Sequence, residues 1–216
     1  MTKPVQLPLQ LSYREAFGRE EFLVSDCNMQ AVAWIDTYPT LPQKSVLIYG
    51  PARCGKTHLA TVFSDKIYRL SDLAEEDLSS LPDKFVVENI DDENASETFF
   101  FHLLNFIKEH NSAVIFTARK IPDFKMPEVQ SRIALIPTIQ IRQPDDFLMM
   151  SLLCKFFQQR HVLVESDVIS YLMTHLARSF DTIFDFVEKA DRQSLCEKRK
   201  LTIPLCKKII ENSAHP

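Results

Sequence analysis

Between residues 45 and 141, short apolar runs alternate with longer segments in which apolar residues recur at helical spacing. The short runs are rich in Val, Ile and Phe, a composition typical of buried strands. They cover residues 45–49, 85–87, 113–117 and 136–141. Pro137 restricts the last run, because proline is tolerated best near the start of a strand or at a sheet edge.

The segments between these runs predict helices. Residues 97–110 place six apolar side chains on one broad face, which indicates a helix packed against a core. Residues 57–63 also form a helical pattern, and residues 31–36 predict a short helix that ends before Pro39. Strands that alternate with helices predict an α/β fold, in which a parallel sheet is covered by helices.

After Pro144 the pattern becomes entirely helical. Three or four helices are expected, with Ser166 as the N-cap of the second. A fourth helix would have Thr202 as its N-cap and Pro204 in its first turn. We therefore expect three parts: a tail over residues 1–12, an α/β domain over 13–143, and a small all-helical domain over 144–216.

The composition is that of an ordinary globular chain, with 45% hydrophobic and 25% charged residues. A formal net charge of −4 argues against a large basic face for DNA. We find no run of about 18 apolar residues and no secretory signal pattern, so we expect no membrane contact and a cytoplasmic protein. The five cysteines include no CxxC pair, which favours reduced thiols over disulfides or zinc.

Glycine is scarce, yet two of the three glycines, Gly50 and Gly55, lie in one motif, where average usage would give about fifteen in the chain. The motif is GxxxxGK[ST], the phosphate-binding P-loop, and it lies between a predicted strand and a predicted helix. Lys56 would reach the β- and γ-phosphates, and Thr57 would ligate Mg²⁺. The candidate cofactor-binding residues of the loop are Gly50, Pro51, Ala52, Arg53, Cys54, Gly55, Lys56 and Thr57.

Arg53 stands where many P-loops carry another glycine. If its backbone needs a positive φ, arginine costs about 1 kcal/mol or more there, and nucleotide affinity is reduced.

A second acidic signal follows the run at 85–87. A strand that ends in an acidic residue should lie beside the P-loop strand and hold Mg²⁺ through water, and Glu88 supplies that residue. Asn89 stands where a second acid usually polarises the attacking water, so intrinsic ATP hydrolysis should be slow. Asp91 and Asp92 are expected to lie beyond the strand. Thr117 ends the next strand, where a polar residue can touch the γ-phosphate.

Two arginines are further candidates. Arg132 follows a predicted short helix and would project to the nucleotide of a neighbouring subunit. Arg178 lies in the helical domain and would contact phosphate. For both residues, an exposed surface charge is an equally good reading of the sequence alone.

These features in this order make the chain resemble an AAA+ protein of the DnaA clade, and within that clade the Hda (HdaA-like) family of regulatory inactivators of DnaA. The resemblance covers nearly the whole chain. It is carried by Arg19–Val24 with Asn28, the P-loop with His58 and Leu59, residues 86–89, 101–105, 117–119, 131–132, 144–146 and 178–180.

The resemblance implies roles for particular residues. Phe22, Val24 and Asn28 would line the adenine side of the pocket, and His58 would belong to the nucleotide site with the P-loop. Glu88 would be the Walker B residue, Thr117 sensor I, Arg132 the arginine finger acting in trans, and Arg178 sensor II. Thr57 and Glu88 would hold the Mg²⁺ of a bound ADP or ATP.

The N-terminal sequence Gln6-Leu-Pro-Leu-Gln-Leu11 is similar to the hexapeptide with which this family binds the sliding clamp of DNA polymerase. Leu9 and Leu11 would enter an apolar cleft of the clamp, beside Leu7, while Gln6 would hydrogen-bond at its edge. A ring-shaped partner with several sites can bind firmly through such short contacts.

The resemblance implies an adaptor that sits on the clamp (β subunit) at the replisome and stimulates hydrolysis of DnaA-bound ATP in trans, which prevents re-initiation of replication. It implies little or no ATPase activity of its own and no sequence-specific DNA contact, and it leaves a homodimer open. Two other hypotheses stand beside it. One is an autonomous AAA+ ATPase of the helicase-loader type acting on DNA, and the other is a binding module that uses the fold only as a scaffold.

Overall fold

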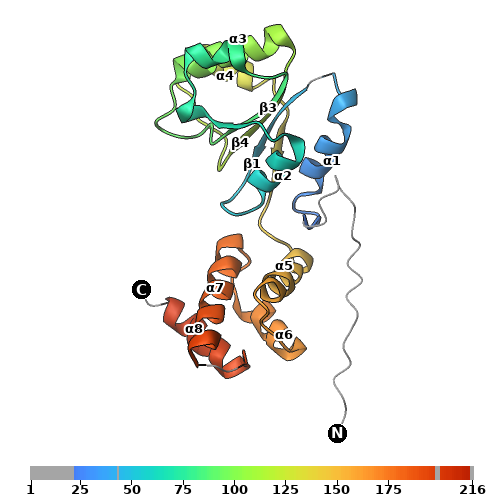
Figure 1. The fold of residues 1–216 in the computed structure, drawn as a ribbon, viewed down its shortest axis with the longest axis vertical. Helices are drawn as coiled ribbons and strands as arrows, with labels where there is room; N and C mark the ends of the chain where they lie inside the picture. Colours follow the sequence, from blue (N-terminus) through green and yellow to red (C-terminus); the bar gives the residue numbers. More distant parts are fainter. Residues whose placement is uncertain (1–21, 43, 198–199, 215–216) are drawn as a thin grey trace. The chain divides into compact units, whose positions relative to one another are not determined.

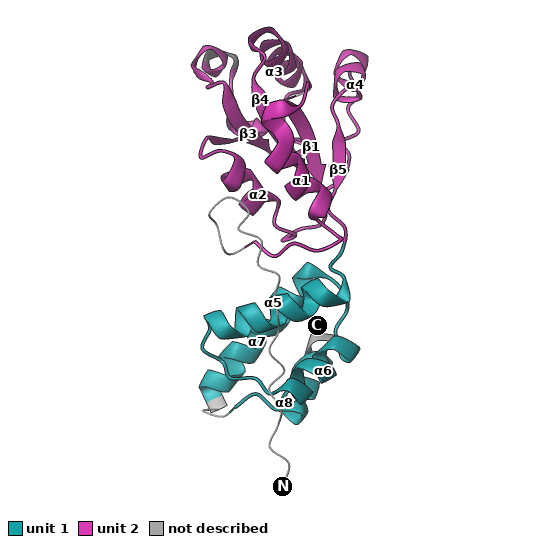
Figure 2. Cartoon of the chain, turned by 90° about the vertical axis from the view of Figure 1, so that its right-hand side faces the viewer, with its two compact units in different colours: residues 1–14, 143–216 teal, residues 15–142 magenta. Residues whose placement is uncertain are grey.

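The computed structural model describes residues 22–42, 44–197 and 200–214. The chain divides into two compact units, and the division falls between Arg142 and Gln143 (Figure 2). The candidate clamp-binding residues Gln6, Leu7, Leu9 and Leu11 lie outside the described residues. Within the described part of the chain, no helix has the length and apolar character needed to cross a membrane.

The α/β unit, labelled unit 2 in Figure 2, is built on a five-stranded parallel sheet with strand order β2-β3-β4-β1-β5. The strands are β1 (Ser45–Tyr49), β2 (Ile67–Arg69), β3 (Lys84–Glu88), β4 (Ala113–Ala118) and β5 (Thr138–Gln140). The four predicted strands are confirmed, and β5 is an edge strand that begins after Pro137, as the proline requires. Strand β2 was missed because it has three residues and no fully buried side chain.

Helices cover both faces of the sheet (Figure 1). They are α1 (Met29–Thr37), α2 (Lys56–Phe63), α3 (Glu97–His110) and α4 (Pro127–Ile133), with 3₁₀ turns at Tyr38–Thr40, Leu70–Asp72 and Glu75–Ser80. Because side chains alternate along a strand, Leu47 and Phe85 face α3 and α4, where they join one core with Phe100 and Phe116. Helices α1 and α2 lie on the opposite side.

In the helical unit, labelled unit 1 in Figure 2, the elements among the described residues are all helices, as the sequence predicts. They are α5 (Asp146–Gln159), α6 (Ser166–His175), α7 (Phe180–Glu197) and α8 (Ile203–Ala214). Its core includes Leu153, Leu172 and Val187, none of which is exposed to solvent. Helix α8 begins after Thr202 with Pro204 in its first turn, but Ser166 is the first residue of α6 and not its N-cap, which is Glu165.

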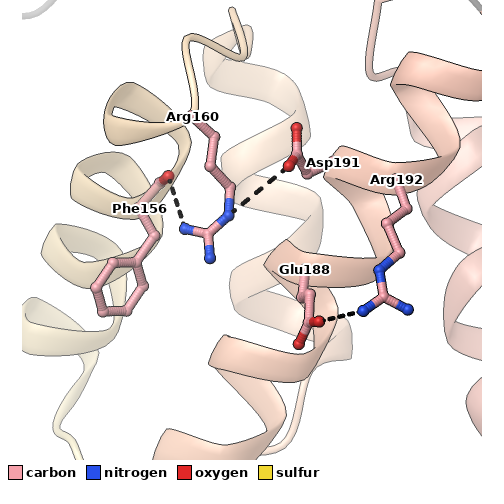
Figure 3. A network of polar contacts seen from close by, with 5 residues as sticks. All are labelled: Phe156, Arg160, Glu188, Asp191 and Arg192. Atoms are coloured by element: carbon pink, nitrogen blue, oxygen red, sulfur yellow. Dashed lines mark hydrogen bonds and ion pairs between the residues drawn. The ribbon is translucent and has the colours of Figure 1, made fainter.

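Polar contacts on the surface of this unit join α5 to α7 (Figure 3). Arg160, which follows α5, donates to the Phe156 carbonyl at 3.3 Å and lies 3.9 Å from the carboxylate of Asp191 on α7. Arg192 pairs with Glu188 one helical turn earlier on α7. The Arg192–Glu188 pair is exposed and lies within α7, so it contributes little to stability. The half-buried Arg160–Asp191 contact is at the long end of the range for an ion pair, so the apolar core is the main link between these helices.

Candidate functional site

The P-loop joins the end of β1 to the start of α2, the context in which its backbone N–H groups can face a phosphate. Gly55 is the N-cap residue of α2 and has a φ of 94°, which glycine adopts without strain. A Cβ on Gly50 would lie 2.5 Å from the carbonyl oxygen of Ile141. Both glycines are therefore required by the backbone: Gly55 by its φ, and Gly50 by its close approach to residue 141.

Arg53 adopts a left-handed backbone with a φ of 58°. The sequence predicted reduced nucleotide affinity if residue 53 needs a positive φ, and the structure shows that it has one. A left-handed conformation costs a non-glycine residue about 1–2 kcal/mol. The loop therefore holds strain at a position where glycine would remove it.

The ammonium group of Lys56 is held by the loop itself. Its Nζ donates to the carbonyl oxygens of Gly50 at 2.9 Å and Pro51 at 2.7 Å, and lies 3.6 Å from Cys54 Sγ. Burial raises the pKa of the Cys54 thiol, against a smaller opposing effect of the Lys56 charge. Cys54 therefore packs as a neutral side chain beneath the loop. The positive charge of the loop comes from the ammonium group of Lys56.

Thr57 and Glu88 come together although they are 31 residues apart. Thr57 Oγ1 donates to Glu88 Oε1 at 2.6 Å. The sequence placed the Glu88 strand beside the P-loop strand, and this is wrong, because β4 lies between β3 and β1. Glu88 still reaches Thr57, since the carboxyl ends of parallel strands meet at one edge of the sheet. Hydroxyl and carboxylate oxygens are ligands that suit Mg²⁺, so the pair fits the expected ion.

Thr117 lies at the same edge, near the end of the intervening strand β4, and is 2% exposed. Its hydroxyl accepts a 3.4 Å hydrogen bond from the backbone N–H of Asn89. Asn89 is the first residue after β3 and has a φ of 55°. Asp91 therefore lies beyond the strand, as expected. Asp91 instead accepts from the backbone N–H of Arg119 at 2.9 Å, which ties together the loops that follow β3 and β4.

The segment before α1 lies against the P-loop. The Phe22 ring is close enough to Gly55 that a Cβ there would sit 2.9 Å from it, and it meets the His58 ring edge to face at 5.2 Å. Asn28 is 3% exposed, and its side chain donates to the Leu23 carbonyl at 2.9 Å. Phe22 thus lies beside the predicted phosphate loop. The side-chain amide of Asn28 instead stabilises the turn before α1 through hydrogen bonds with the backbone of Leu23 and Ser25.

Arg132 lies inside the last turn of α4, and not after a helix as the sequence suggested. Its guanidinium carbon is 4.5 Å from the centre of the Phe101 ring on α3. It lines a cleft with Ser45 and Ser112, where β1 and β4 begin. The P-loop follows the other end of β1, so the structure separates Arg132 from the nucleotide loop of its own chain.

Arg178 belongs to the helical unit, in the segment between α6 and α7. Its Nε donates to Asp146 Oδ1 at 2.6 Å, and Asp146 lies in the first turn of α5. The Arg178 guanidinium lowers the pKa of the Asp146 carboxyl, and the carboxylate in turn raises the pKa of Arg178. The structure therefore pairs the candidate phosphate-contacting arginine with an acid of its own unit.

Sequence reasoning missed two partners of the site residues, Phe101 beneath Arg132 and Asp146 beside Arg178. It also missed the contact of Asp91, in the loop after β3, with the loop after β4. The pair Asp145-Asp146 does carry a local signal, since Asp145 caps α5 by accepting from the N–H of Leu148 at 2.7 Å. The sequence offers no comparable signal for the contact between Phe101 and Arg132.

Comparison with known proteins gives matches in both units. Residues 147–210 match the family model described as the lid domain of Hda. An uncharacterized protein from Haemophilus influenzae is 28% identical over 194 residues, which cover 79% of this chain and 83% of that protein. The chromosomal replication initiator protein DnaA of Flavobacterium psychrophilum is 22% identical over 129 residues, covering 58% of this chain but only 27% of that protein.

Solved structures share the fold at low sequence identity. Domain III of the replication initiation protein DnaA from Thermotoga maritima has a TM-score of 0.73 at 15% identity, covering 91% of this chain and 96% of that chain. AMPPCP-bound DnaA from Aquifex aeolicus has a TM-score of 0.61 at 16% identity, covering 87% and 71%. The Thermotoga maritima RuvB branch migration motor has a TM-score of 0.68 at 11% identity, covering 94% and 73%. These likenesses confirm the predicted fold class, a parallel sheet flanked by helices with a helical lid.

Proposed function

Because the chain is a DnaA-like AAA+ protein with an Hda-type lid, we propose that it inactivates the replication initiator DnaA by stimulating hydrolysis of the ATP bound to DnaA. Arg132 acts in trans as the arginine finger. The location of Arg132 is the observation that carries this proposal.

Arg132 lines a cleft with Ser45, the first residue of β1, whereas Gly50 follows the last residue of that strand. A strand of this length spans about 16 Å at roughly 3.3 Å per residue. An arginine at the far end of the sheet is badly placed to serve the phosphates of its own P-loop. The arrangement favours a role for Arg132 at a nucleotide held by another subunit.

Phe101 supports that role. The ring lies beneath the guanidinium at 4.5 Å, a cation–π contact that restricts the side chain. The planar face is then covered, and the N–H groups at its edge stay available for phosphate oxygens. In the transition state those N–H groups would neutralise charge on the transferred phosphoryl group, an effect that can be worth roughly 10³–10⁵ in rate.

The chain's own site would hold ADP or ATP with Mg²⁺. The DnaA structure from Aquifex aeolicus contains AMPPCP. The two glycines of the P-loop here, between β1 and α2, and the Thr57–Glu88 pair support binding of such a ligand. Lys56 would exchange the carbonyls of Gly50 and Pro51 for phosphate oxygens. Asn89 has no carboxylate to polarise a water, so this bound nucleotide would turn over slowly and serve mainly to order the site.

The partners in this proposal are DnaA and the sliding clamp of DNA polymerase. The tail residues Gln6, Leu7, Leu9 and Leu11 would bind the clamp and bring Arg132 to DnaA at the replisome. The acidic charge of the chain agrees with DNA contact made through partners.

The test is release of phosphate from ATP-loaded DnaA in the presence of DNA-loaded clamp, with and without this protein. We expect stimulation that requires the clamp, is lost on removal of residues 1–11, and falls to the background rate in Arg132→Ala. Clamp binding by Arg132→Ala should equal that of the wild type. Arg119→Ala is the matched control, because it removes an arginine from the opposite edge of the sheet.

Absence of stimulation by wild-type protein that is folded and binds the clamp would refute the proposal. Substantial ATP turnover by the chain alone, increased by single-stranded DNA, would instead favour an autonomous ATPase. Stimulation that is unaffected by Lys56→Ala would indicate that the chain's own nucleotide is dispensable.

A further inference from the structure

A cleft of about 350 Å³ opens where β1 and β4 begin, at the edge of the sheet opposite the P-loop. Its apolar lining comes from Leu104 and Ile107 on α3 and from Leu135 and Ile136, which follow α4. Arg132 lies at its rim. A cleft of this size can admit a small ligand group, so its polar lining decides which chemistry it accepts.

Two serine hydroxyls lie on the floor of the cleft. Ser45 is 6% exposed and Ser112 is 3% exposed. Side chains at every second residue share a face, so Ser45 and Ser112 face α3 and α4 together with Leu47 and Val114. Neither hydroxyl has a hydrogen-bond partner among the described residues. Among those residues, the one side-chain N or O atom that is both fully buried and unpartnered is Ser194 Oγ. The hydroxyls of Ser45 and Ser112 are therefore partly accessible. Buried hydroxyls are normally hydrogen-bonded, so both can donate to an acceptor in the cleft.

The rim of the cleft is positively charged. It carries Lys44, Lys108 and Arg132, and among the described residues no carboxylate side chain lines the cleft. Within the described part of the chain, none of these three cations forms an ion pair. The face of Arg132 rests on Phe101, and no residue that the structure describes accepts a hydrogen bond from its N–H groups. Three cations around two donor hydroxyls form a site whose complement is an anion with several oxygen atoms.

We propose that this cleft binds the phosphate groups of a nucleoside triphosphate, with Lys44, Lys108, Ser45 and Ser112 as binding residues beside Arg132. The anion site follows from the cleft alone. Its use on the ATP of a partner subunit rests on the proposed function, and in that case the two lysines draw the triphosphate to Arg132. A free nucleoside triphosphate has the same chemistry and is the other source.

Lysine acylation read out by peptide mass spectrometry tests the site residue by residue. The full-length protein is treated with an amine-acylating reagent with and without inorganic tripolyphosphate. We expect tripolyphosphate to slow acylation of Lys44 and Lys108 by about fivefold or more, the effect of one close charge pair. Lys66, an exposed lysine near Asp65, is the control and should be unaffected. Acylation of Lys44 and Lys108 that tripolyphosphate leaves unchanged, while Lys56 is protected, would overturn the inference.

A second arm replaces tripolyphosphate with ATP-loaded or ADP-loaded DnaA. Protection of Lys44 and Lys108 by the ATP-loaded form alone assigns the triphosphate to the partner. Protection by free tripolyphosphate but by neither form of DnaA assigns the site to free nucleotide. Because the first arm contains no DnaA, failure of the proposed function leaves its result unchanged.

Charge-removing variants complete the test. In Lys44→Gln and Lys108→Gln, the tripolyphosphate concentration that half-protects the remaining lysine should rise about fivefold, whereas Lys66→Gln should match the wild type. Equal half-protecting concentrations in all four proteins would count against the site.

Discussion

Thr57 Oγ1 donates a 2.6 Å hydrogen bond to Glu88 Oε1, so the first turn of α2 is joined to the end of β3. Glu88 ends β3, and Thr57 lies on α2, which follows β1 and the P-loop. Strand β4 lies between β3 and β1, so the two residues reach each other across the end of β4. Together they place a hydroxyl and a carboxylate at the mouth of the P-loop, a position where both can contact one divalent cation.

This pair predicts how nucleotide affinity depends on Mg²⁺. Thr57→Ala should weaken binding of ATP in the presence of Mg²⁺ by roughly ten- to hundredfold, because a contact to a charged group worth about 1.5–3 kcal/mol is lost. Without Mg²⁺ the variant and the wild type should bind alike. Titration of a fluorescent ATP analogue in both conditions measures this. Thr61→Ala is the control, since the Thr61 hydroxyl only donates to the His58 carbonyl on the same helix. An equal loss with and without Mg²⁺ would contradict a metal role for Thr57.

The backbone of Arg53 predicts a stabilising substitution. With a φ of 58°, Arg53→Gly should raise the free energy of unfolding of the α/β unit by about 1 kcal/mol, whereas Arg53→Val should lower it. Trp34 is the single tryptophan and is buried on α1, so its fluorescence during urea unfolding reports on this unit. A lower stability for Arg53→Gly would show that the arginine side chain contributes more than its backbone costs.

The Asp146–Arg178 pair predicts an acid-dependent change in the lid. Arg178 lowers the pKa of Asp146 in the folded protein. The stabilisation is therefore fully present above the ordinary carboxyl pKa and is lost as the pH falls through the lowered value. We expect Asp146→Asn to melt at a lower temperature than the wild type near pH 7, with a small difference because the pair is exposed. The two proteins should converge once the pH falls below the lowered pKa of Asp146, and a difference that stays equal from neutral to acidic pH would contradict an ionic contribution.

Burial predicts the order in which the thiols react. Burial raises the pKa of Cys206 to about 11, and this side chain is 0% exposed. Cys196 is exposed on α7. Iodoacetamide at about pH 8 should modify Cys196 at least tenfold faster than Cys206, because only the accessible thiolate reacts. Peptide mass spectrometry over time measures both rates, and in urea the two should approach each other. Equal rates in the native protein would indicate that the lid opens around Cys206.

Local patterns specified much of this chain correctly. Helix α3 begins at Glu97 and ends at His110, as predicted, because its apolar spacing, its Ser96 cap and its left-handed Asn111 are all local signals. The P-loop could also be predicted from the sequence, since the backbone of the loop requires glycine at two positions within a span of six residues, Gly50 and Gly55, and the motif is therefore local. Strand β2 could not, because three half-exposed residues carry no periodicity.

Contacts between distant residues were beyond the sequence. The pairing of Arg178 with Asp146 joins residues 32 positions apart, and that of Thr57 with Glu88 joins residues 31 apart. Periodicity states which face of an element is apolar, but not which element packs on that face. For this reason no order of β1, β3 and β4 could be predicted, apart from the wrong expectation that β1 and β3 are neighbours.

By itself, the sequence determined the strands of the central sheet except β2, the helical nature of the lid and the P-loop motif between a strand and a helix, because each depends on residues close together in the chain. The tertiary structure alone decided that Arg132 rests on Phe101 at the edge of the sheet away from the P-loop, and that Ser45 and Ser112 share a cleft with it. The order of the strands and the packing of α3 against α4 produce that arrangement, and both are set by burial of the whole core.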